Sequence, residues 1–218
     1  MSAASPVAFY FDPISPYAWL AGLQVVRLDA AGLQVDFKPV LFAGLLAAHG
    51  TKGPAEVPAK RLYTFRDVMR QAASLGARMT GPPAHPFNPL RALRMCIAVE
   101  DAGARRRFGL ALMDAAWGRG LDLMSSSDLP RIADESGLDG AALSLRADDP
   151  AIKERLAAQT SAAVASGIFG VPTFLCEGEI FWGADRIDAV LRRAAGHTID
   201  EALLATALAR PAAATRKI

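Results

Sequence analysis

Residues 7–21, VAFYFDPISPYAWLA, constrain the fold of this 218-residue chain more than any other stretch. The apolar run from Val7 to Phe11 is typical of a buried strand, and a turn containing two prolines follows it. Ser15 then stands directly before Pro16 and a helical pattern. Ser is favoured as the N-cap of a helix and Pro at its first position. The stretch therefore predicts a buried strand that leads into a helix beginning at Ser15.

The predicted position of Ser15 has two interpretations. A helix N-terminus carries free N–H groups and the positive end of the helix dipole, so it favours a bound anion, including a thiolate. Ser15 would then take part in binding that anion. The alternative is that Ser15 only caps the helix. This stretch alone leaves both interpretations open.

The next segments extend the first strand into a β-α-β unit. Residues 17–31 have one apolar helical face and are followed by Gly32, which predicts the end of the helix. Residues 33–40 alternate apolar and polar side chains, as a strand with one buried face does. Pro39 places this strand near a sheet edge. A helix between two such strands favours a right-handed parallel crossover.

The middle of the chain, from about residue 41 to 168, contains no convincing strand. Helices are predicted over residues 41–48, 57–75, 90–102, 105–119, 127–135 and 149–165. The Gly- and Pro-rich segment 49–58 and the Pro-rich segment 76–89 are predicted loops. The second loop is long for a compact domain, which favours a binding or lid role.

Strand character returns at Val171. Residues 174–176 and 179–182 form short β runs around Glu177-Gly178, a hairpin signal, and helices over 184–195 and 199–208 follow. The early parallel and late antiparallel pairs must share one sheet to bury their faces. The chain is thus predicted to be an α/β protein with a thioredoxin-like fold. Its thioredoxin-like domain comprises residues 1–41 and 168–210, with an all-helical insertion at 42–167 and a frayed tail at 211–218.

Composition excludes several classes of function. Hydrophobic residues make up 52% of the chain, which supports a sizeable core, and the formal net charge is only +2. Neither a nucleic acid nor an anionic membrane is expected as a partner. The N-terminus lacks the pattern of a secretory signal, and no apolar run approaches the ~20 residues of a membrane span. We therefore expect a soluble, cytoplasmic protein.

The cysteines and histidines predict neither a disulfide nor a metal site. Cys96 and Cys176 are far apart, and both are expected to be buried as small apolar side chains. The three histidines show no metal-ligand spacing with Cys or carboxylates.

Four runs together resemble the 2-hydroxychromene-2-carboxylate isomerases. These enzymes belong with the kappa-class glutathione transferases and are related in fold to the periplasmic disulfide oxidoreductases. The runs are FYFDPISPYAWLA at the start, PAEVPAKR at 54–61, PPAHPFNPLRALR at 82–94 and GIFGVPTFLCEGEIFWGADRID at 167–188. The resemblance extends to about residue 195. Its most specific part is the pairing of the Ser-Pro helix start with GVPTF and GADR.

The resemblance gives Ser15 a chemical role. In thioredoxin-like proteins the reactive residue lies at the N-terminus of the first helix, and redox members have Cys there. Ser15 cannot perform thiol–disulfide exchange, but its hydroxyl can donate a hydrogen bond to the thiolate of glutathione and lower the thiol pKa. A serine-hydrolase role is less well supported, because the chain has no GxSxG elbow and no recognisable His–acid pair.

The resemblance also implies a glutathione site near the end of the chain. Pro172 would follow a cis peptide bond, so that the backbone of Val171 pairs with the cysteinyl backbone of glutathione. The turn would bind the γ-glutamyl end, with its ammonium on Asp185. That turn comprises Trp182, Gly183, Ala184 and Asp185. The alternatives are an ordinary trans loop proline, since few X-Pro bonds are cis, and a simple helix cap at Asp185.

The second substrate implied by the resemblance is a planar aromatic 2-oxo acid or its cyclic hemiketal. Its carboxylate needs cations or polar groups, and the candidates are Lys52, Lys60, Arg61, His49 and Asn88. Lys60 and Arg61 are alternatively solvated helix residues. Many family members have Asn in the loop after Gly50, where this chain has Thr51, so the identity of the substrate stays open.

The function implied is that of a glutathione-dependent cis/trans isomerase, with glutathione as cofactor. The thiolate would add to the conjugated double bond, the resulting single bond would rotate, and elimination would release the isomer. The alternatives are a kappa-like glutathione transferase that releases the conjugate, and a non-catalytic thioredoxin-like binding module. The resemblance also implies a homodimer.

Overall fold

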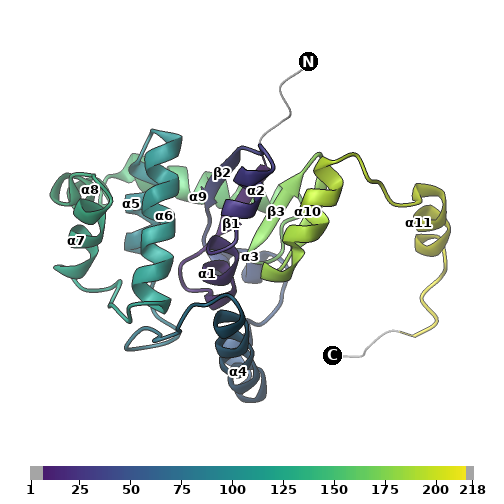
Figure 1. Ribbon diagram of the computed structural model, residues 1–218, viewed down its shortest axis with the longest axis horizontal. Coiled ribbons are helices and arrows are strands. Elements are labelled where there is room, and N and C mark those ends of the chain that lie inside the picture. Colours follow the sequence, from purple (N-terminus) through teal and green to yellow (C-terminus); the bar gives the residue numbers. More distant parts are fainter. Residues whose placement is uncertain (1–6, 215–218) are drawn as a thin grey trace.

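Strand β1 (Val7–Phe11) lies inside a four-stranded sheet of order β2-β1-β3-β4 in the computed structural model, which describes residues 7–214 (Figure 1). The parallel partner of β1 is β2 (Val35–Pro39), and its antiparallel partner is β3 (Thr173–Cys176). The hairpin is completed by β4 (Glu179–Trp182). One sheet therefore joins the two ends of the chain, and β2 lies at its edge, both as predicted.

The order of the elements matches the predicted one: a β-α-β unit, a block of helices and a β-β-α unit. Their bounds are α1 Pro16–Gly22, α2 Val26–Ala30, α3 Phe42–Ala48, α4 Pro58–Ser74, α5 Leu90–Ala98, α6 Ala102–Trp117, α7 Asp128–Glu135, α8 Gly140–Arg146, α9 Pro150–Ala165, α10 Ile187–Ala194 and α11 Glu201–Leu208, with 3-10 turns η1 at Pro54–Glu56 and η2 at Ala184–Arg186.

Both faces of the sheet are covered by helices. On one face Phe9, Phe11 and Phe174 join the main core, with the Phe9 and Phe174 rings stacked at 4.7 Å. Helix α6 packs closely there at Gly109, because a Cβ at this position would lie 2.8 Å from the Phe11 ring. On the other face Tyr10 packs with residues of α3 and α9. Both α6 and α9 come from the predicted insertion, so the insertion completes the core of the sheet.

The helix predicted over residues 17–31 is divided into α1 and α2. At the division, the N–H groups of Gln24 and Val25 donate to carbonyls three residues earlier, which tightens the turn. The Gln24 amide also donates to the carbonyls of Leu20 and Ala184. The hydrogen bond from the Gln24 side chain to Ala184 therefore connects the end of the first helix to the turn after β4.

Two further helix boundaries differ from the prediction. The break expected at Gly103 lies earlier, because Asp101 caps α6 by accepting a hydrogen bond from the Ala104 N–H at 2.7 Å. Helix α8 was not predicted, although Asp139 caps it through the Ala142 N–H. In both cases the helix begins at an Asp N-cap that was not recognised in the sequence. The predicted start of α9 at Asp149-Pro150 is confirmed.

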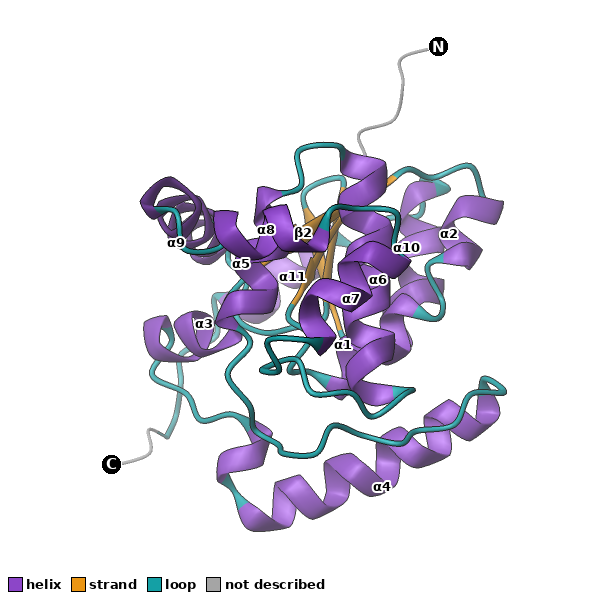
Figure 2. Ribbon diagram, turned by 90° about the vertical axis from the view of Figure 1, so that its left-hand side faces the viewer, coloured by secondary structure: helices purple, strands orange, loops and turns teal. Residues whose placement is uncertain are grey.

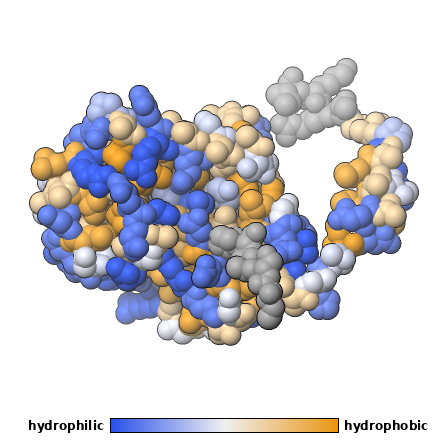
Figure 3. Space-filling model, turned by 90° about the horizontal axis from the view of Figure 1, so that it is seen from above, coloured by the Kyte–Doolittle hydropathy of each residue, from blue (hydrophilic) through white to orange (hydrophobic). Residues whose placement is uncertain are grey.

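Helix α11 stands apart from the body (Figures 1 and 3), and none of its residues is buried. The predicted tail at 211–218 lies partly outside the described residues, which end at 214. The division into domains at residues 41 and 168 remains a prediction. Between residues 7 and 214, no helix is long and apolar enough to cross a membrane. Cys96 and Cys176 are both buried free thiols, as predicted.

Candidate active site

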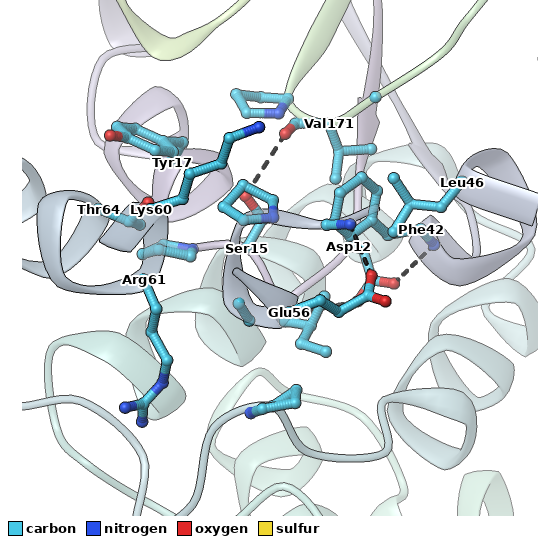
Figure 4. A pocket seen from close by; sticks show the side chains of 18 of the residues that line it. Asp12, Ser15, Tyr17, Phe42, Leu46, Glu56, Lys60, Arg61, Thr64 and Val171 are labelled. Carbon is cyan, nitrogen blue, oxygen red and sulfur yellow. Dashed lines mark hydrogen bonds between the residues drawn. The ribbon is translucent and has the colours of Figure 1, made fainter. Parts of the chain in front are cut away.

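A cavity of about 1110 Å³, called the main cavity below, opens beside the N-terminus of α1 (Figure 4). Its walls come from the turn after β1, α3, the segment from Thr51 through α4, the loop before β3 and the turn at η2. Helix α4 runs across the molecule below α1 (Figure 2) and forms one side of it. Segments from both ends of the chain and from the insertion thus meet at one place.

Ser15 is the N-cap of α1 and is almost fully buried at the wall of the main cavity. Its Oγ accepts a hydrogen bond from the Ala18 N–H at 3.2 Å. The hydroxyl also lies 3.5 Å from the carbonyl oxygen of Val171, at the outer limit of a hydrogen bond (Figure 4). Because this contact is long, the hydroxyl proton is available to a ligand that offers a better acceptor.

The loop before β3 faces Ser15 across the cavity. The peptide bond between Val171 and Pro172 is cis, as the resemblance implied. The Pro172 carbonyl accepts a hydrogen bond from the Gly183 N–H at 3.0 Å, which holds the loop against the turn at η2. Val171 itself precedes the paired residues of β3. Its N–H has no acceptor among the described residues, and its carbonyl has only the long Ser15 contact.

The turn from Trp182 to Asp185 lines the main cavity as a unit, together with Ser15 and the cis-proline loop. Gly183 has φ +123°, and a Cβ there would lie 2.5 Å from Asp185 Oδ1, so this position requires glycine. The exposed Asp185 carboxylate pairs with Arg186 at 2.9 Å. Ala184 and Asp185 begin a helical turn, where N–H groups lack partners within the helix. The turn therefore offers an acid and free amides side by side.

The opposite wall carries three cations together with the acids Glu56 and Asp67. Lys52, Lys60 and Arg61 all line the main cavity, as the predicted substrate site requires. Arg61 donates to the His85 carbonyl at 3.2 Å, and its guanidinium lies over the Phe65 ring. Lys60 projects inward, whereas Arg61 points away (Figure 4). Within the described part of the chain, Lys52 and Lys60 have no ion-pair partner.

Two predicted substrate-binding residues do not reach the main cavity. His49, the residue after α3, has its Nε2 3.2 Å from the Ile168 carbonyl, on the α9 side of α3. Asn88 is exposed and accepts a hydrogen bond from the Leu90 N–H at the start of α5. Both side chains contact backbone groups, His49 that of the distant Ile168 and Asn88 that of the nearby Leu90, and neither lines the main cavity.

Asp12 lines the main cavity and was not predicted as a site residue. It is fully buried, and its two oxygens accept hydrogen bonds from the Ile14 N–H at 3.0 Å and the Phe42 N–H at 2.9 Å. Burial raises its pKa to about 7, against the lowering effect of these two hydrogen bonds. The signal in the sequence was an acidic residue placed directly after an apolar strand.

His85 and Tyr17 complete the wall between α1 and α4. His85 Nε2 donates to the Ile14 carbonyl at 3.2 Å, and burial lowers the pKa of the ring. The Tyr17 hydroxyl donates a hydrogen bond to Asp67 Oδ2 at 2.9 Å. The pKa of Tyr17 is raised, mainly by burial and to a smaller extent by this hydrogen bond. Trp19, by contrast, is buried in the core.

Comparison with known proteins agrees with this arrangement. Residues 6–195 match the model of the DSBA-like thioredoxin domain. A 2-hydroxychromene-2-carboxylate isomerase of Pseudomonas putida is 31% identical over 190 residues, which cover 83% of this chain and 90% of that protein. Glutathione S-transferase kappa 1 of Rattus norvegicus is 24% identical over 195 residues, covering 82% of this chain and 86% of that protein.

A solved structure of a 2-hydroxychromene-2-carboxylate isomerase superposes with a TM-score of 0.81 at 25% identity, covering 95% of this chain and all of that one. The thioredoxin-like fold and the resemblance inferred from the sequence motifs are both confirmed. The chain belongs to the DSBA-like thioredoxin family and, within it, to the family of 2-hydroxychromene-2-carboxylate isomerases.

Proposed function

We propose that this protein is a glutathione-dependent isomerase of an aromatic 2-oxo acid or its cyclic hemiketal, of the 2-hydroxychromene-2-carboxylate type. The observation that carries the proposal is the position of Ser15, whose hydroxyl faces the unpaired backbone of Val171 across the main cavity at the N-terminus of α1. A hydroxyl donor and a helix N-terminus directed at one point suit a thiolate.

The residues present fit glutathione as cofactor. A γ-glutamyl group needs an acceptor for its ammonium and donors for its carboxylate, and the turn at η2 supplies the Asp185 carboxylate and free amides. The cysteinyl residue needs a strand-like partner, and among the described residues the Val171 N–H has no acceptor and its carbonyl has only the long Ser15 contact. Its sulfur would then lie near Ser15. The γ-glutamyl end, the cysteinyl backbone and the sulfur thus each have a partner of the right chemistry in the main cavity.

Bound glutathione would supply the thiolate that adds to the conjugated double bond of the substrate and leaves after rotation. Ser15 would hold that sulfur by donating its hydroxyl proton, while the α1 N–H groups favour the negative charge. Lys60 and Lys52 would bind the substrate carboxylate. Phe42, Leu46 and Phe169 line the cavity and would exclude water during the reaction. A reaction that uses reduced glutathione fits the cytoplasm, where thiols are kept reduced.

A kappa-like transferase is the second candidate, and the similarity to glutathione S-transferase kappa 1 favours it. It would use the same glutathione-binding residues. The two functions differ in the fate of glutathione, which an isomerase regenerates and a transferase consumes. Counting free glutathione after many turnovers distinguishes them.

The test compares wild type with Ser15→Ala, using Ser74→Ala as the control because Ser74 is exposed and lies outside the main cavity. Millimolar glutathione should raise the Tm of wild type and Ser74→Ala. Turnover of 2-hydroxychromene-2-carboxylate should fall about a hundredfold or more in Ser15→Ala, the usual effect of losing a donor to a developing anion. Unchanged turnover in Ser15→Ala would reduce Ser15 to a helix cap. Absence of any Tm shift in wild type would exclude glutathione as ligand.

A further inference from the structure

A second cavity, of about 450 Å³, lies on the far side of α3 from most of the main cavity, among α3, α5 and α9. Helix α9 packs against both α3 and α5. The apolar side chains Leu41, Leu90, Leu156 and Val164 line this second cavity, and Arg94 and Lys153 bring positive charge to it. Its volume falls within the range of about 300–1,000 Å³ that is usual for small-molecule sites.

The guanidinium of Arg94 is the unusual feature of this place. Its Nε is buried and has no hydrogen-bond partner, and the side chain makes no ion pair within the described residues. Arg91, one turn earlier on α5, is fully engaged by Asp148 and Ser144. Buried N–H groups are nearly always hydrogen-bonded in native proteins. The Nε atom is too buried to meet a ligand, but the Nη groups of this half-buried side chain also have no acceptor among the described residues, so they are free to bind one.

The other residues that line the second cavity indicate which class of ligand would bind there. No acidic side chain lines the second cavity, while the exposed Lys153 adds a second cation without an ion-pair partner in the described part of the chain. The Ser161 hydroxyl offers a further donor. The Thr160 hydroxyl is already used, since it donates to the Leu156 carbonyl and accepts from the Leu41 N–H. The free donors thus favour an anion, and the leucine and valine walls favour an apolar body attached to it.

We propose that the second cavity binds a small carboxylic acid with an apolar chain, its carboxylate on Arg94 and Lys153 and its chain between α3 and α9. A guanidinium matches a carboxylate in geometry. Leu41 lines both cavities, so the two sites share a wall, but their cations come from different elements: α5 and α9 here, and the loop before α4 with α4 itself in the main cavity.

The test is calorimetric titration of the full chain with hexanoate, with uncharged hexanamide as the matched probe. Arg94→Gln and Lys153→Gln should each weaken hexanoate binding about tenfold or more, as loss of a charged hydrogen bond does. Arg91→Gln, on the same helix but outside the cavity, should bind as wild type does. Hexanamide should bind at least tenfold more weakly than hexanoate.

Several results would overturn the proposal. Wild type that fails to bind hexanoate, or Arg94→Gln that binds it as wild type does, would exclude the site. Loss of binding in Lys60→Gln alone would assign the anion to the main cavity. Inorganic phosphate binding as tightly as hexanoate would refute the requirement for an apolar body. If Arg94→Gln does not fold, the exposed Lys153→Gln carries the same decision.

A stability measurement tests the unpaired Nε separately. Arg94→Met keeps the length of the side chain and removes the buried donor, so without ligand its Tm should equal or exceed that of wild type. Hexanoate should raise the Tm of wild type and leave that of Arg94→Met unchanged. An equal hexanoate shift in both proteins would refute the role of Arg94 as an anion ligand.

Discussion

Asp12 Oδ2 accepts a hydrogen bond from the Phe42 N–H at 2.9 Å, which fastens the turn before Ser15 to the first residue of α3. The other oxygen accepts from Ile14 inside that turn. A buried carboxyl therefore connects the segment that positions Ser15 to a helix that forms a wall of the main cavity.

The stability of the protein should depend on the ionisation of Asp12. Its pKa is raised from 3.8 to about 7 in the folded state, so the fold binds a proton that the unfolded chain releases between these values. Stability from this group is present at low pH and is lost as pH rises from about 4 to about 7, by on the order of 4 kcal/mol.

Asp12→Asn should abolish that contribution. The difference in unfolding free energy between wild type and Asp12→Asn, measured by urea denaturation from pH 4 to 8, should fall steadily up to about pH 7 and then level off. Asp185→Asn, at an exposed carboxylate, is the control. A difference that does not change with pH would contradict the raised pKa.

Removing the Tyr17 hydroxyl should loosen α4. Tyr17→Phe deletes the hydrogen bond to Asp67, the polar link between α1 and α4, and should lower the unfolding free energy by about 1 kcal/mol. Hydrogen exchange of α4 amides should become faster. Tyr63→Phe, whose ring is exposed on the same helix, should have no such effect; equal exchange in the two variants would refute the link.

Gly183→Ala should damage the turn at η2. The added Cβ meets Asp185 Oδ1 at 2.5 Å, and φ +123° is strained for alanine, so both stability and glutathione-induced stabilisation should decrease. Gly137→Ala is the matched control, because Gly137 also has a positive φ of +78° but has open space around it and lies outside the main cavity. The unfolding free energy of Gly137→Ala should fall by about 1 kcal/mol, and its Tm should fall accordingly. Glutathione should still raise its Tm as much as it raises that of wild type.

Lys60→Gln should raise the KM for the aromatic acid more than it changes kcat, since Lys60 is expected to bind the substrate carboxylate in the ground and transition states alike. Arg61→Gln should have a smaller effect, because Arg61 is already engaged by the His85 carbonyl and the Phe65 ring. Steady-state kinetics of the two variants decide this; an equal KM in wild type and Lys60→Gln would remove Lys60 from the substrate site.

The two cysteines should be unreactive in the folded protein. Burial raises the pKa of Cys96 to about 12 and raises that of Cys176 as well. Iodoacetamide at pH 8, followed by mass spectrometry, should label neither in native protein and both in denaturant. Rapid labelling of Cys176 in native protein would show that this thiol is accessible and that activity assays with thiols need a Cys-free control.

Local features of the fold were predictable because neighbouring residues decide them. The Ser15-Pro16 and Asp149-Pro150 helix starts and the hairpin at Glu177-Gly178 all lie where the pattern indicates. The helix break after Gly22 was not predicted, and at it the side chain of Gln24 donates a hydrogen bond to the carbonyl of Ala184, 160 residues away, a contact that no local pattern indicates.

The location of the predicted site residues could be inferred from the sequence for some of them. Ser15, Val171 and Asp185, which the motif resemblance assigned to one site, line one cavity, and Lys60 and Arg61 line it as well. His49 and Asn88 do not, because proximity along the chain to cavity-lining residues does not fix the direction of a side chain. Their roles in binding stay predictions.

By itself the sequence determined the strand, turn and capped helix that present Ser15, since propensity and capping act over a few residues. Only the tertiary structure decided that Asp12 is buried against Phe42, that Ser15 faces Val171 and that Arg94 has no acceptor among residues 7–214. These relationships depend on which distant segments meet in the folded chain and on how much water they exclude, and no local pattern carries that information.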